Sequence, residues 1–337
     1  MSVTPVILAA GKGTRMKSDL PKVLHPILGK PMIHYALSAA QKAADRTPVL
    51  VIGHQAERIE TALVNQDCEF AYQKEQLGTG HAVLQTKNLL QGKTELVLVT
   101  YGDMPAVRAS TLEQLVDTQR KNNRGPVTML TVTVEDPRGF GRVVRDDQGA
   151  VAAVVEDADA SPAQREIREL NAGMYCFDAE WLWDALEKLT LSPQGEYYLT
   201  DLIASAVNEN LTVSAVSTDD RRELIGINNR VHLAEATAIL QRRINQKWML
   251  AGVSIPDPTS VFISPDVQVG QDTVILPQTH LQGKTVIGRE CEIGPNSIVV
   301  ESKIGNQCEI LSSVVEFAVL EDRVDIGPFS HLRKGAH

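Results

Sequence analysis

Pro5-Val-Ile-Leu-Ala-Ala-Gly-Lys-Gly-Thr-Arg-Met16 is the stretch that decides the fold of this chain. It begins with an unbroken apolar run, residues 6–10, which is typical of a strand buried on both faces of a parallel sheet. The run ends at Gly11 and Gly13, where the backbone can come close to a ligand because no Cβ is in the way. The stretch therefore predicts a buried strand that leads directly into a ligand-binding turn.

Basic side chains surround these glycines, at Lys12, Arg15, Lys17 and Lys22. In a chain with a formal net charge of −9 they form a local positive region, which favours an anionic ligand such as a phosphate. The loop is neither a dinucleotide-binding loop, since Met16 replaces the third glycine, nor a Walker A loop. A tight turn with solvated lysines is the alternative, and Gly-x-Gly alone does not separate the two.

The composition indicates a globular chain of about two domains, because 337 residues of which 43% are apolar can bury a sizeable core. The sequence contains neither an apolar run of about 18 residues, as a membrane span needs, nor a secretory pattern at its N-terminus. The acidic net charge argues against nucleic acid as a partner. Without a C-x-x-C pair, we expect free thiols in a reducing cytoplasm for Cys68, Cys176, Cys291 and Cys308.

Residues 1–227 alternate strand-like and helix-like patterns. Residues 47–53 and 95–100 predict two more buried strands, and residues 32–44 and 110–122 predict helices, the second capped by Ser110-Thr111. Such alternation predicts a doubly wound, Rossmann-like α/β domain whose parallel sheet binds ligands at the carboxyl ends of its strands.

Three further runs predict a more antiparallel insertion that covers the substrate: residues 128–134, 141–145 and 151–155. We expect residues 166–177 to return the chain to the main sheet.

The last third of the chain has a different pattern. Residues 228–250 lack Gly and Pro, which predicts a long linker helix. In residues 251–337 an aliphatic residue followed by glycine recurs with a six-residue period, as in Ile287-Gly288 and Ile293-Gly294. This period is typical of a left-handed parallel β-helix of hexapeptide repeats, and chance pairs in a sandwich are the alternative.

The first loop, Leu8-Ala-Ala-Gly-x-Gly-Thr-Arg-Met16 with Pro21-Lys22, resembles the signature of the sugar-nucleotide pyrophosphorylases. The loop has Ala10 where other members have a second glycine, and in this it resembles the uridyltransferases of N-acetylglucosamine 1-phosphate. Nearly the whole chain resembles the bacterial bifunctional GlmU family. The resemblance implies a cytoplasmic, homotrimeric, Mg²⁺-dependent nucleotidyltransferase. It would make UDP-N-acetylglucosamine and pyrophosphate from UTP and N-acetylglucosamine 1-phosphate, for peptidoglycan and lipopolysaccharide precursors.

The resemblance also implies roles for single residues. Asp103, after the predicted strand at residues 95–100, and Asn228 would bind Mg²⁺, which keeps several waters and takes phosphate oxygens. On the residues alone, Asp103 could instead cap a turn. Arg15 and Lys22 are the implied catalytic residues. They would position and neutralise phosphates, because a sugar phosphate is already ionised and needs no general base.

Other positions would bind the substrates. Gln73, Gly78 and Thr79 are implied to line the uracil pocket, and we expect His81, in the same loop, to cap a helix or interact with its dipole. The remaining implied substrate-binding residues near the nucleotide are Leu8, Ala9, Ala10, Gly11, Lys22, Tyr101 and Gly102.

The implied contacts of the N-acetylglucosamine part are Gly141, Glu156, Asn171 and Asn228, with Tyr198 and Thr200 supporting them. Glu156 also fits an ordinary acidic turn at residues 156–159.

Arg333 matches a sugar-phosphate position of the family's second site, which acetylates glucosamine 1-phosphate with acetyl-CoA. We expect this chain to be C-terminally truncated within the β-helix and to lack that second activity.

Two alternatives remain. The first is another sugar-1-phosphate nucleotidyltransferase, using UTP or dTTP with glucose 1-phosphate, against which Ala10 and the loop at residues 76–80 argue. The second is a non-catalytic sugar-nucleotide-binding scaffold, which would not need Arg15, Lys22, Asp103 and Asn228 together.

Overall fold

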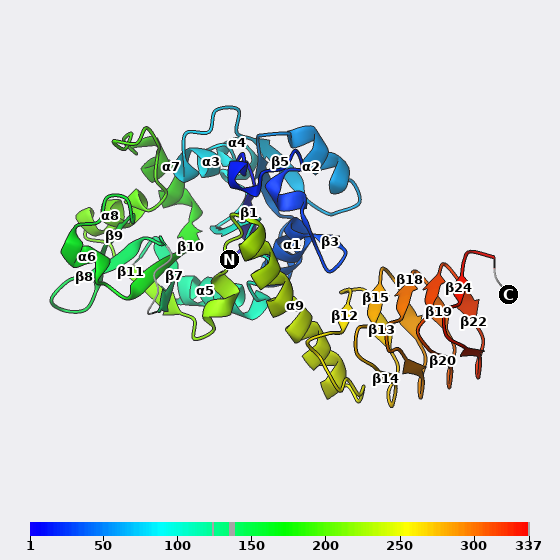
Figure 1. Ribbon diagram of the computed structural model, residues 1–337. Coiled ribbons are helices and arrows are strands. Elements are labelled where there is room, and N and C mark those ends of the chain that lie inside the picture. Colours follow the sequence, from blue (N-terminus) through cyan, green and yellow to red (C-terminus); the bar gives the residue numbers. More distant parts are fainter. Residues whose placement is uncertain (123–124, 135–138, 336–337) are drawn as a thin grey trace. The chain divides into compact units, whose positions relative to one another are not determined.

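Strand β1, Val3–Leu8, lies at the centre of the main sheet, hydrogen-bonded on both sides to parallel strands (Figure 1). The computed structural model describes residues 1–122, 125–134 and 139–335. The chain divides into two units. One contains Met1–His25 and Met32–Asn229, and the other contains Pro26–Pro31 and Arg230–His337.

The main sheet of the first unit has the strand order β11-β7-β10-β6-β1-β4-β5. Every residue of β1 is buried, as the apolar run predicts. The other strands of this order are β4 (Val49–Ile52), β5 (Glu69–Tyr72), β6 (Leu96–Tyr101), β7 (Val127–Thr133), β10 (Glu169–Asp178) and β11 (Val213–Ser217).

Helices cover both faces of this sheet, which explains why its central strands are apolar throughout. Along β6, Val97 and Val99 join the core formed with α3, α7 and α8, whereas Leu96 and Leu98 join the core formed with α1 and α5. The helices of the first unit are α1 (Met32–Ala43), α2 (Ala56–Ala62), α3 (Thr79–Leu84), α4 (Lys87–Leu90), α5 (Ala109–Lys121), α6 (Pro162–Arg165), α7 (Ala179–Glu187) and α8 (Asp201–Asn208).

The doubly wound α/β architecture is confirmed, but the sheet is mixed rather than wholly parallel. Strand β10 runs antiparallel to both of its neighbours, β6 and β7. Strand β7, expected in the antiparallel insertion, belongs to the main sheet, where it also pairs in parallel with β11. Of the strands expected in that insertion, β8 (Arg142–Arg145) and β9 (Val151–Val155) pair antiparallel with each other, and Arg142 of β8 pairs with Leu170 of β10.

The cap expected for α5 is also different. The helix begins at Ala109 after Arg108, without a side-chain cap. The Thr111 hydroxyl donates instead to the Glu223 carboxylate, with an Oγ1–Oε2 distance of 2.6 Å. The residue expected to cap the helix therefore ties it to a distant segment of the chain.

In the second unit, α9 (Arg230–Leu250) packs against the beginning of the solenoid. Gln241 and Asn245 are buried, and each amide donates to the carbonyl oxygen of Val261, at 2.8 and 2.9 Å. A short hairpin, β2 (Pro26–Ile27) with β3 (Lys30–Pro31), belongs to the same unit. The helix thus belongs to this unit.

Residues 262–332 form a parallel β-helix of three sheets, β12-β15-β18-β21-β24, β13-β16-β19-β22 and β14-β17-β20-β23. These strands are Phe262–Ile263, Gln268–Val269, Val274–Ile275, His280–Gln282, Val286–Ile287, Glu292–Ile293, Ile298–Val300, Lys303–Ile304, Glu309–Ile310, Val314–Glu316, Val319–Leu320, Asp325–Ile326 and His331–Leu332. The aliphatic residues of the hexapeptide pattern, such as Ile287 and Ile293, point into the core.

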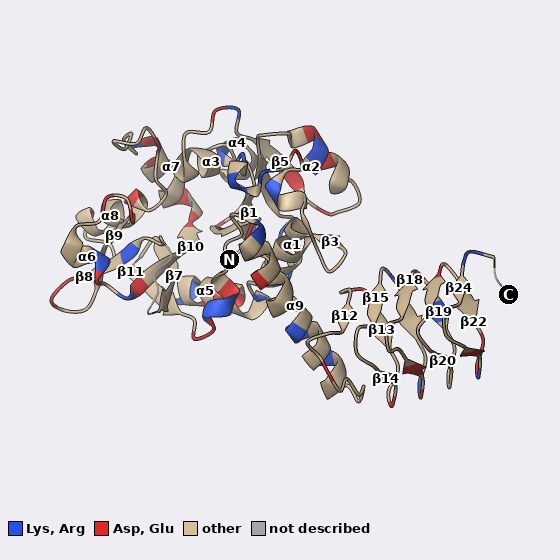
Figure 2. Ribbon diagram, in the orientation of Figure 1, with Lys and Arg blue, Asp and Glu red and all other residues tan. Residues whose placement is uncertain are grey.

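All four cysteines are free, as expected. Among the described residues, no helix is both long and apolar enough to cross a membrane. Acidic and basic residues are interspersed over the elements of both units (Figure 2).

Glycines stack on successive turns of the β-helix, because the backbone of the next turn leaves no room for a side chain. A Cβ on Gly288 would lie 2.3 Å from the carbonyl oxygen of Gly305. At Gly327, which follows β23 in another of the three sheets, a Cβ would meet nothing within 4 Å.

Gly288→Ala should therefore destabilise the β-helix by about 2–4 kcal/mol, because the backbone of two turns must move apart. The matched variant Gly327→Ala should change stability by less than about 0.5 kcal/mol. Urea unfolding of both variants measures the two effects, and equal midpoints would contradict the close packing described.

Candidate functional site

The loop that follows β1 holds its shape because Gly13 lies against Lys22. Gly13 has a φ of 61°, and a Cβ on it would lie 2.7 Å from the Cβ of Lys22. The glycine thus lets the short helix η1, Thr14–Met16, lie beside η2, Lys22–Leu24. Gly11 is exposed, and a Cβ there would meet nothing within 4 Å, so its backbone is open to a ligand.

The start of this loop lies between the carboxyl ends of two neighbouring strands. The Ala9 amide donates to the Val51 carbonyl oxygen at 2.8 Å, and the Gly102 amide donates to the Leu8 carbonyl oxygen at 3.0 Å. The Gln76 side chain donates to the Ala10 carbonyl oxygen at 2.8 Å. The predicted residues Leu8, Ala9, Ala10, Gly11, Tyr101 and Gly102 therefore lie at one edge of the sheet.

Four predicted residues meet at this edge in two pairs. The Lys22 ammonium forms an ion pair with the Asp103 carboxylate. The Arg15 guanidinium donates to the Asn228 side-chain oxygen, with an Nη2–Oδ1 distance of 3.0 Å. The Ile227 amide donates to the Asp103 carbonyl oxygen at 3.0 Å, so residues 103 and 228 are held close together.

Asp103 and Asn228 present a carboxylate and an amide oxygen, which are the hard ligands that Mg²⁺ prefers. Among the described residues, no group of three or more His, Cys, Asp or Glu could hold a metal ion. Two protein oxygens suit Mg²⁺ rather than a metal that needs a full protein cage, because Mg²⁺ retains waters and binds phosphates. The residues present fit a magnesium site that a nucleotide completes.

A buried carboxylate supports the segment that carries Asn228. Glu223 lies in η3, Arg221–Leu224, and is 2% exposed. It accepts hydrogen bonds from the Thr111 hydroxyl and the Arg108 amide, and it pairs with the Arg108 guanidinium at 3.2 Å. This role could not be predicted, because residues 219–223 are all charged and resemble a solvated surface turn.

The predicted uracil pocket is built around Gln73, which is 4% exposed. Its side-chain amide donates to the Gly78 carbonyl oxygen at 3.0 Å and lies 3.1 Å from Nδ1 of His81. The Thr79 hydroxyl oxygen accepts a hydrogen bond from the Leu199 amide at 3.0 Å. These contacts bring together all three residues predicted for this pocket.

Of the two roles expected for His81, the structure rules out that of a cap for α3. The helix begins at Thr79 after Gly78, so His81 is already inside its first turn. The His81 ring lies between the side chains of Gln73 and Gln85, each at 3.1 Å. It helps to orient Gln73.

On the predicted sugar side, Glu156 is partly buried and accepts a hydrogen bond from the Thr200 hydroxyl at 2.9 Å. Burial raises the pKa of the Glu156 carboxyl above its ordinary value, and neighbouring acidic groups raise it further, while the Thr200 hydrogen bond opposes the shift. Glu156 is therefore not part of an ordinary exposed acidic turn.

Asn171 is 6% exposed and is held on both sides of its amide. Its nitrogen donates to the Tyr175 hydroxyl oxygen at 2.7 Å, and its oxygen accepts from the Gly173 amide at 3.0 Å. Its backbone amide donates to the Gly141 carbonyl oxygen at 2.9 Å, which joins two predicted sugar contacts.

Arg142, the last residue of the Gly-Phe-Gly-Arg segment at 139–142 that the sequence places on the sugar side, links two segments of this side. It is 2% exposed, donates to the Phe140 carbonyl oxygen, and pairs with Asp157 at 2.8 Å. It therefore holds the residues beside Gly141 and Glu156.

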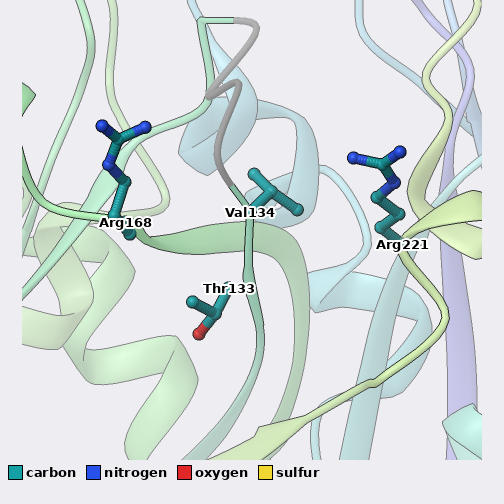
Figure 3. A pocket seen from close by; sticks show the side chains of 4 residues that line it. All are labelled: Thr133, Val134, Arg168 and Arg221. Atoms are coloured by element: carbon teal, nitrogen blue, oxygen red, sulfur yellow. The ribbon is translucent and has the colours of Figure 1, made fainter.

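Two features lie outside this set of residues. Arg333 is exposed just after β24 in the second unit. In the first unit, a surface pocket of about 840 Å³ is lined by Thr133, Val134, Arg168 and Arg221, none of which was predicted to bind substrate (Figure 3).

Comparisons with known proteins match the two parts of the chain to two different family models. A family model for nucleotidyl transferases matches residues 4–249, and one for the bacterial transferase hexapeptide repeat matches residues 266–300. A solved UDP-glucose pyrophosphorylase, complexed with UDP-glucose, has a similar fold, with a TM-score of 0.56 and 20% identity. The match covers 72% of this chain and all of that one.

Curated relatives are similar over nearly the whole chain. The bifunctional protein GlmU of Heliobacterium modesticaldum is 46% identical over 98% of this chain and 72% of its own length. Those of Enterococcus faecalis and Listeria monocytogenes are 45% and 44% identical, each over 72% of its own length. The chain belongs to the nucleotidyl transferase family and, within it, to the bifunctional GlmU family.

Proposed function

We propose that this chain transfers a uridylyl group from UTP to N-acetylglucosamine 1-phosphate, forming UDP-N-acetylglucosamine and releasing pyrophosphate. The observation that carries the proposal is the meeting of Arg15, Lys22, Asp103 and Asn228 beside the open loop after β1. Two cations and two metal-binding oxygens at one sheet edge suit a triphosphate. Membership of the GlmU family supports the choice of sugar and nucleotide.

In the proposed reaction a phosphate oxygen of the sugar phosphate attacks the α-phosphorus of UTP. The new oxygen–phosphorus bond forms as the bond to pyrophosphate breaks, so no side chain has to remove a proton. Lys22 neutralises charge around the reacting phosphorus, and Arg15 holds the leaving pyrophosphate oxygens. Mg²⁺ bound by Asp103 and Asn228 would supply further charge neutralisation.

The substrate contacts follow the three parts of the site. Gln73, Gly78 and Thr79 bind uracil, and the sheet edge formed by Leu8, Ala9, Ala10, Gly11, Tyr101 and Gly102 lies along the nucleotide. Gly141, Glu156, Asn171 and Asn228 bind the N-acetylglucosamine part. The enclosure of Gln73 and Asn171 by fixed hydrogen bonds supports these roles, because pre-oriented amides discriminate between ligands.

We also infer a division into a nucleotidyltransferase domain at 1–227, a helix at 228–250 and a β-helix at 251–337. The β-helix exposes large apolar side chains, Phe317 at 55%, Val319 at 63% and Phe329 at 91%. This exposure supports self-association through the β-helix. Membership of the GlmU family supports the further proposal that the assembly is a cytoplasmic homotrimer.

A substrate panel tests the proposed reaction. Pyrophosphate release is measured with UTP or dTTP and with N-acetylglucosamine 1-phosphate or glucose 1-phosphate, in Mg²⁺ and in EDTA. We expect UTP with N-acetylglucosamine 1-phosphate to give the highest kcat/KM and EDTA to abolish release. A higher kcat/KM with glucose 1-phosphate would replace the proposed sugar substrate, and nucleotide binding without release would favour a scaffold.

Lys22→Met should lower kcat by about 10²–10³-fold, because it removes a charge that stabilises the transition state. The control is Lys87→Met, since Lys87 forms a comparable ion pair with Glu187, is 18% exposed, and lies outside the proposed site. Both variants should keep the fold, as measured by circular dichroism. Equal turnover in the two variants would remove Lys22 from the mechanism.

Glu156→Gln should raise the melting temperature at about pH 7–8 and weaken binding of the sugar phosphate, with a KM about tenfold higher. The folded chain binds the Glu156 proton more tightly than the unfolded chain, because its pKa is raised from 4.5. The free energy of unfolding therefore falls as the pH rises from the pKa of Glu156 in the unfolded chain to its higher pKa in the folded chain. The glutamine of the variant has no charge to gain, so the variant does not lose this stability. The difference in melting temperature should vanish as pH falls towards about 4. Equal melting temperatures of the variant and the unsubstituted chain at every pH would contradict this prediction.

A further inference from the structure

Each side chain assigned to Mg²⁺ already contacts a basic side chain assigned to the phosphates. The Lys22 ammonium contacts Oδ2 of Asp103, and the Arg15 guanidinium donates to Oδ1 of Asn228 at 3.0 Å. Both side chains that would bind a metal are therefore engaged before a nucleotide arrives.

The contact between Lys22 and Asp103 is shielded from solvent, since their side chains are only 16% and 19% exposed. Charges interact more strongly in such a setting than in bulk water. A divalent cation that binds Asp103 competes with the ammonium for this carboxylate and is repelled by it. When the ammonium is displaced, Lys22 loses its only anionic contact among those described. Separating the pair is costly unless a new anion reaches Lys22.

The contact between Arg15 and Asn228 also joins a basic side chain to a metal-binding oxygen, but it is weaker than the ion pair of Lys22. Arg15 is exposed, and Asn228 is neutral, so less is lost when this hydrogen bond breaks. Both contacts nevertheless link the loop after β1 to the pair of oxygens at residues 103 and 228. A triphosphate that draws both cations away would free both oxygens at once.

We propose that Lys22 and Arg15 hold the metal-binding oxygens in the nucleotide-free protein and exchange places with the metal when a triphosphate binds. The inference rests on the proposed function, because it takes its metal ligands and phosphate-binding cations from there. On binding, the two basic groups move to phosphate oxygens while the metal takes the oxygens of Asp103 and Asn228. The exchange breaks no covalent bond and needs no proton transfer.

The exchange makes the metal and the nucleotide bind cooperatively. The protein alone binds a divalent cation weakly, since that cation must leave Lys22 without a partner. A bound triphosphate removes this cost and strengthens metal binding. By thermodynamic reciprocity, the metal strengthens nucleotide binding by the same factor. Lys22 thus has a role before chemistry that is separate from its role in turnover.

Mn²⁺ binding to the full chain without nucleotide tests the exchange. Electron paramagnetic resonance of free Mn²⁺ reports the bound fraction directly and does not depend on activity. We expect Lys22→Met to bind Mn²⁺ about tenfold more tightly than the unsubstituted chain, and Arg15→Met about threefold more tightly. Because Arg15 is exposed, its variant keeps the test possible if Lys22→Met is unstable.

Two further variants identify the cause of any gain. Lys17→Met removes a charge from an exposed lysine of the same loop and should leave Mn²⁺ affinity unchanged within about twofold. Lys22→Met combined with Asp103→Asn should lose the gain, because the freed carboxylate is removed. Unchanged affinity in both Lys22→Met and Arg15→Met, or an equal gain in Lys17→Met, would overturn the exchange.

Pyrophosphate release by the unsubstituted chain is measured in the same preparation. If the unsubstituted chain releases pyrophosphate but neither Lys22→Met nor Arg15→Met binds Mn²⁺ more tightly, the exchange is rejected and the proposed function stands. The affinity gain without release with any sugar phosphate supports the exchange at this pair of oxygens and rejects uridylyl transfer.

Discussion

Parallel pairing of β1 with β4 and β6 is the constraint on which the candidate site depends. Parallel strands end at the same edge of a sheet, so three chain segments far apart in sequence deliver their next residues to one place. Two backbone hydrogen bonds, from Ala9 to Val51 and from Gly102 to Leu8, extend this pairing beyond β1. Loss of that register would separate Asp103 from the loop that carries Arg15 and Lys22.

Much of the first unit could be predicted because its strands are buried on both faces. Uninterrupted apolar runs such as those of β1 and β6 predict strands buried on both faces and fit few other structures. The residues predicted to bind ligand follow directly after these runs. Asp103 could be located by its position after such a strand. Asn228 could not, because no local pattern marks it and only the resemblance indicated it.

What could not be predicted depends on long-range pairing. The direction of β10 is not encoded in its apolar pattern, which suits a parallel or an antiparallel neighbour equally well. Glu223 and Arg142 are charged residues whose burial follows from partners such as Thr111 and Asp157. Their partners come together only in the folded chain, so no local pattern in the sequence predicts their burial.

The amides of Gln241 and Asn245 have a consequence for how the solenoid behaves in a crowded cell. A first rung has no preceding turn, so its backbone acceptors and apolar interior would be open to a strand from another molecule. Helix α9 blocks this opening, because Ile244 and Trp248 pack against the apolar interior. The side-chain amides of Gln241 and Asn245 donate to a backbone carbonyl oxygen just before the first strand. Neighbouring copies therefore cannot stack end to end on this side and polymerise.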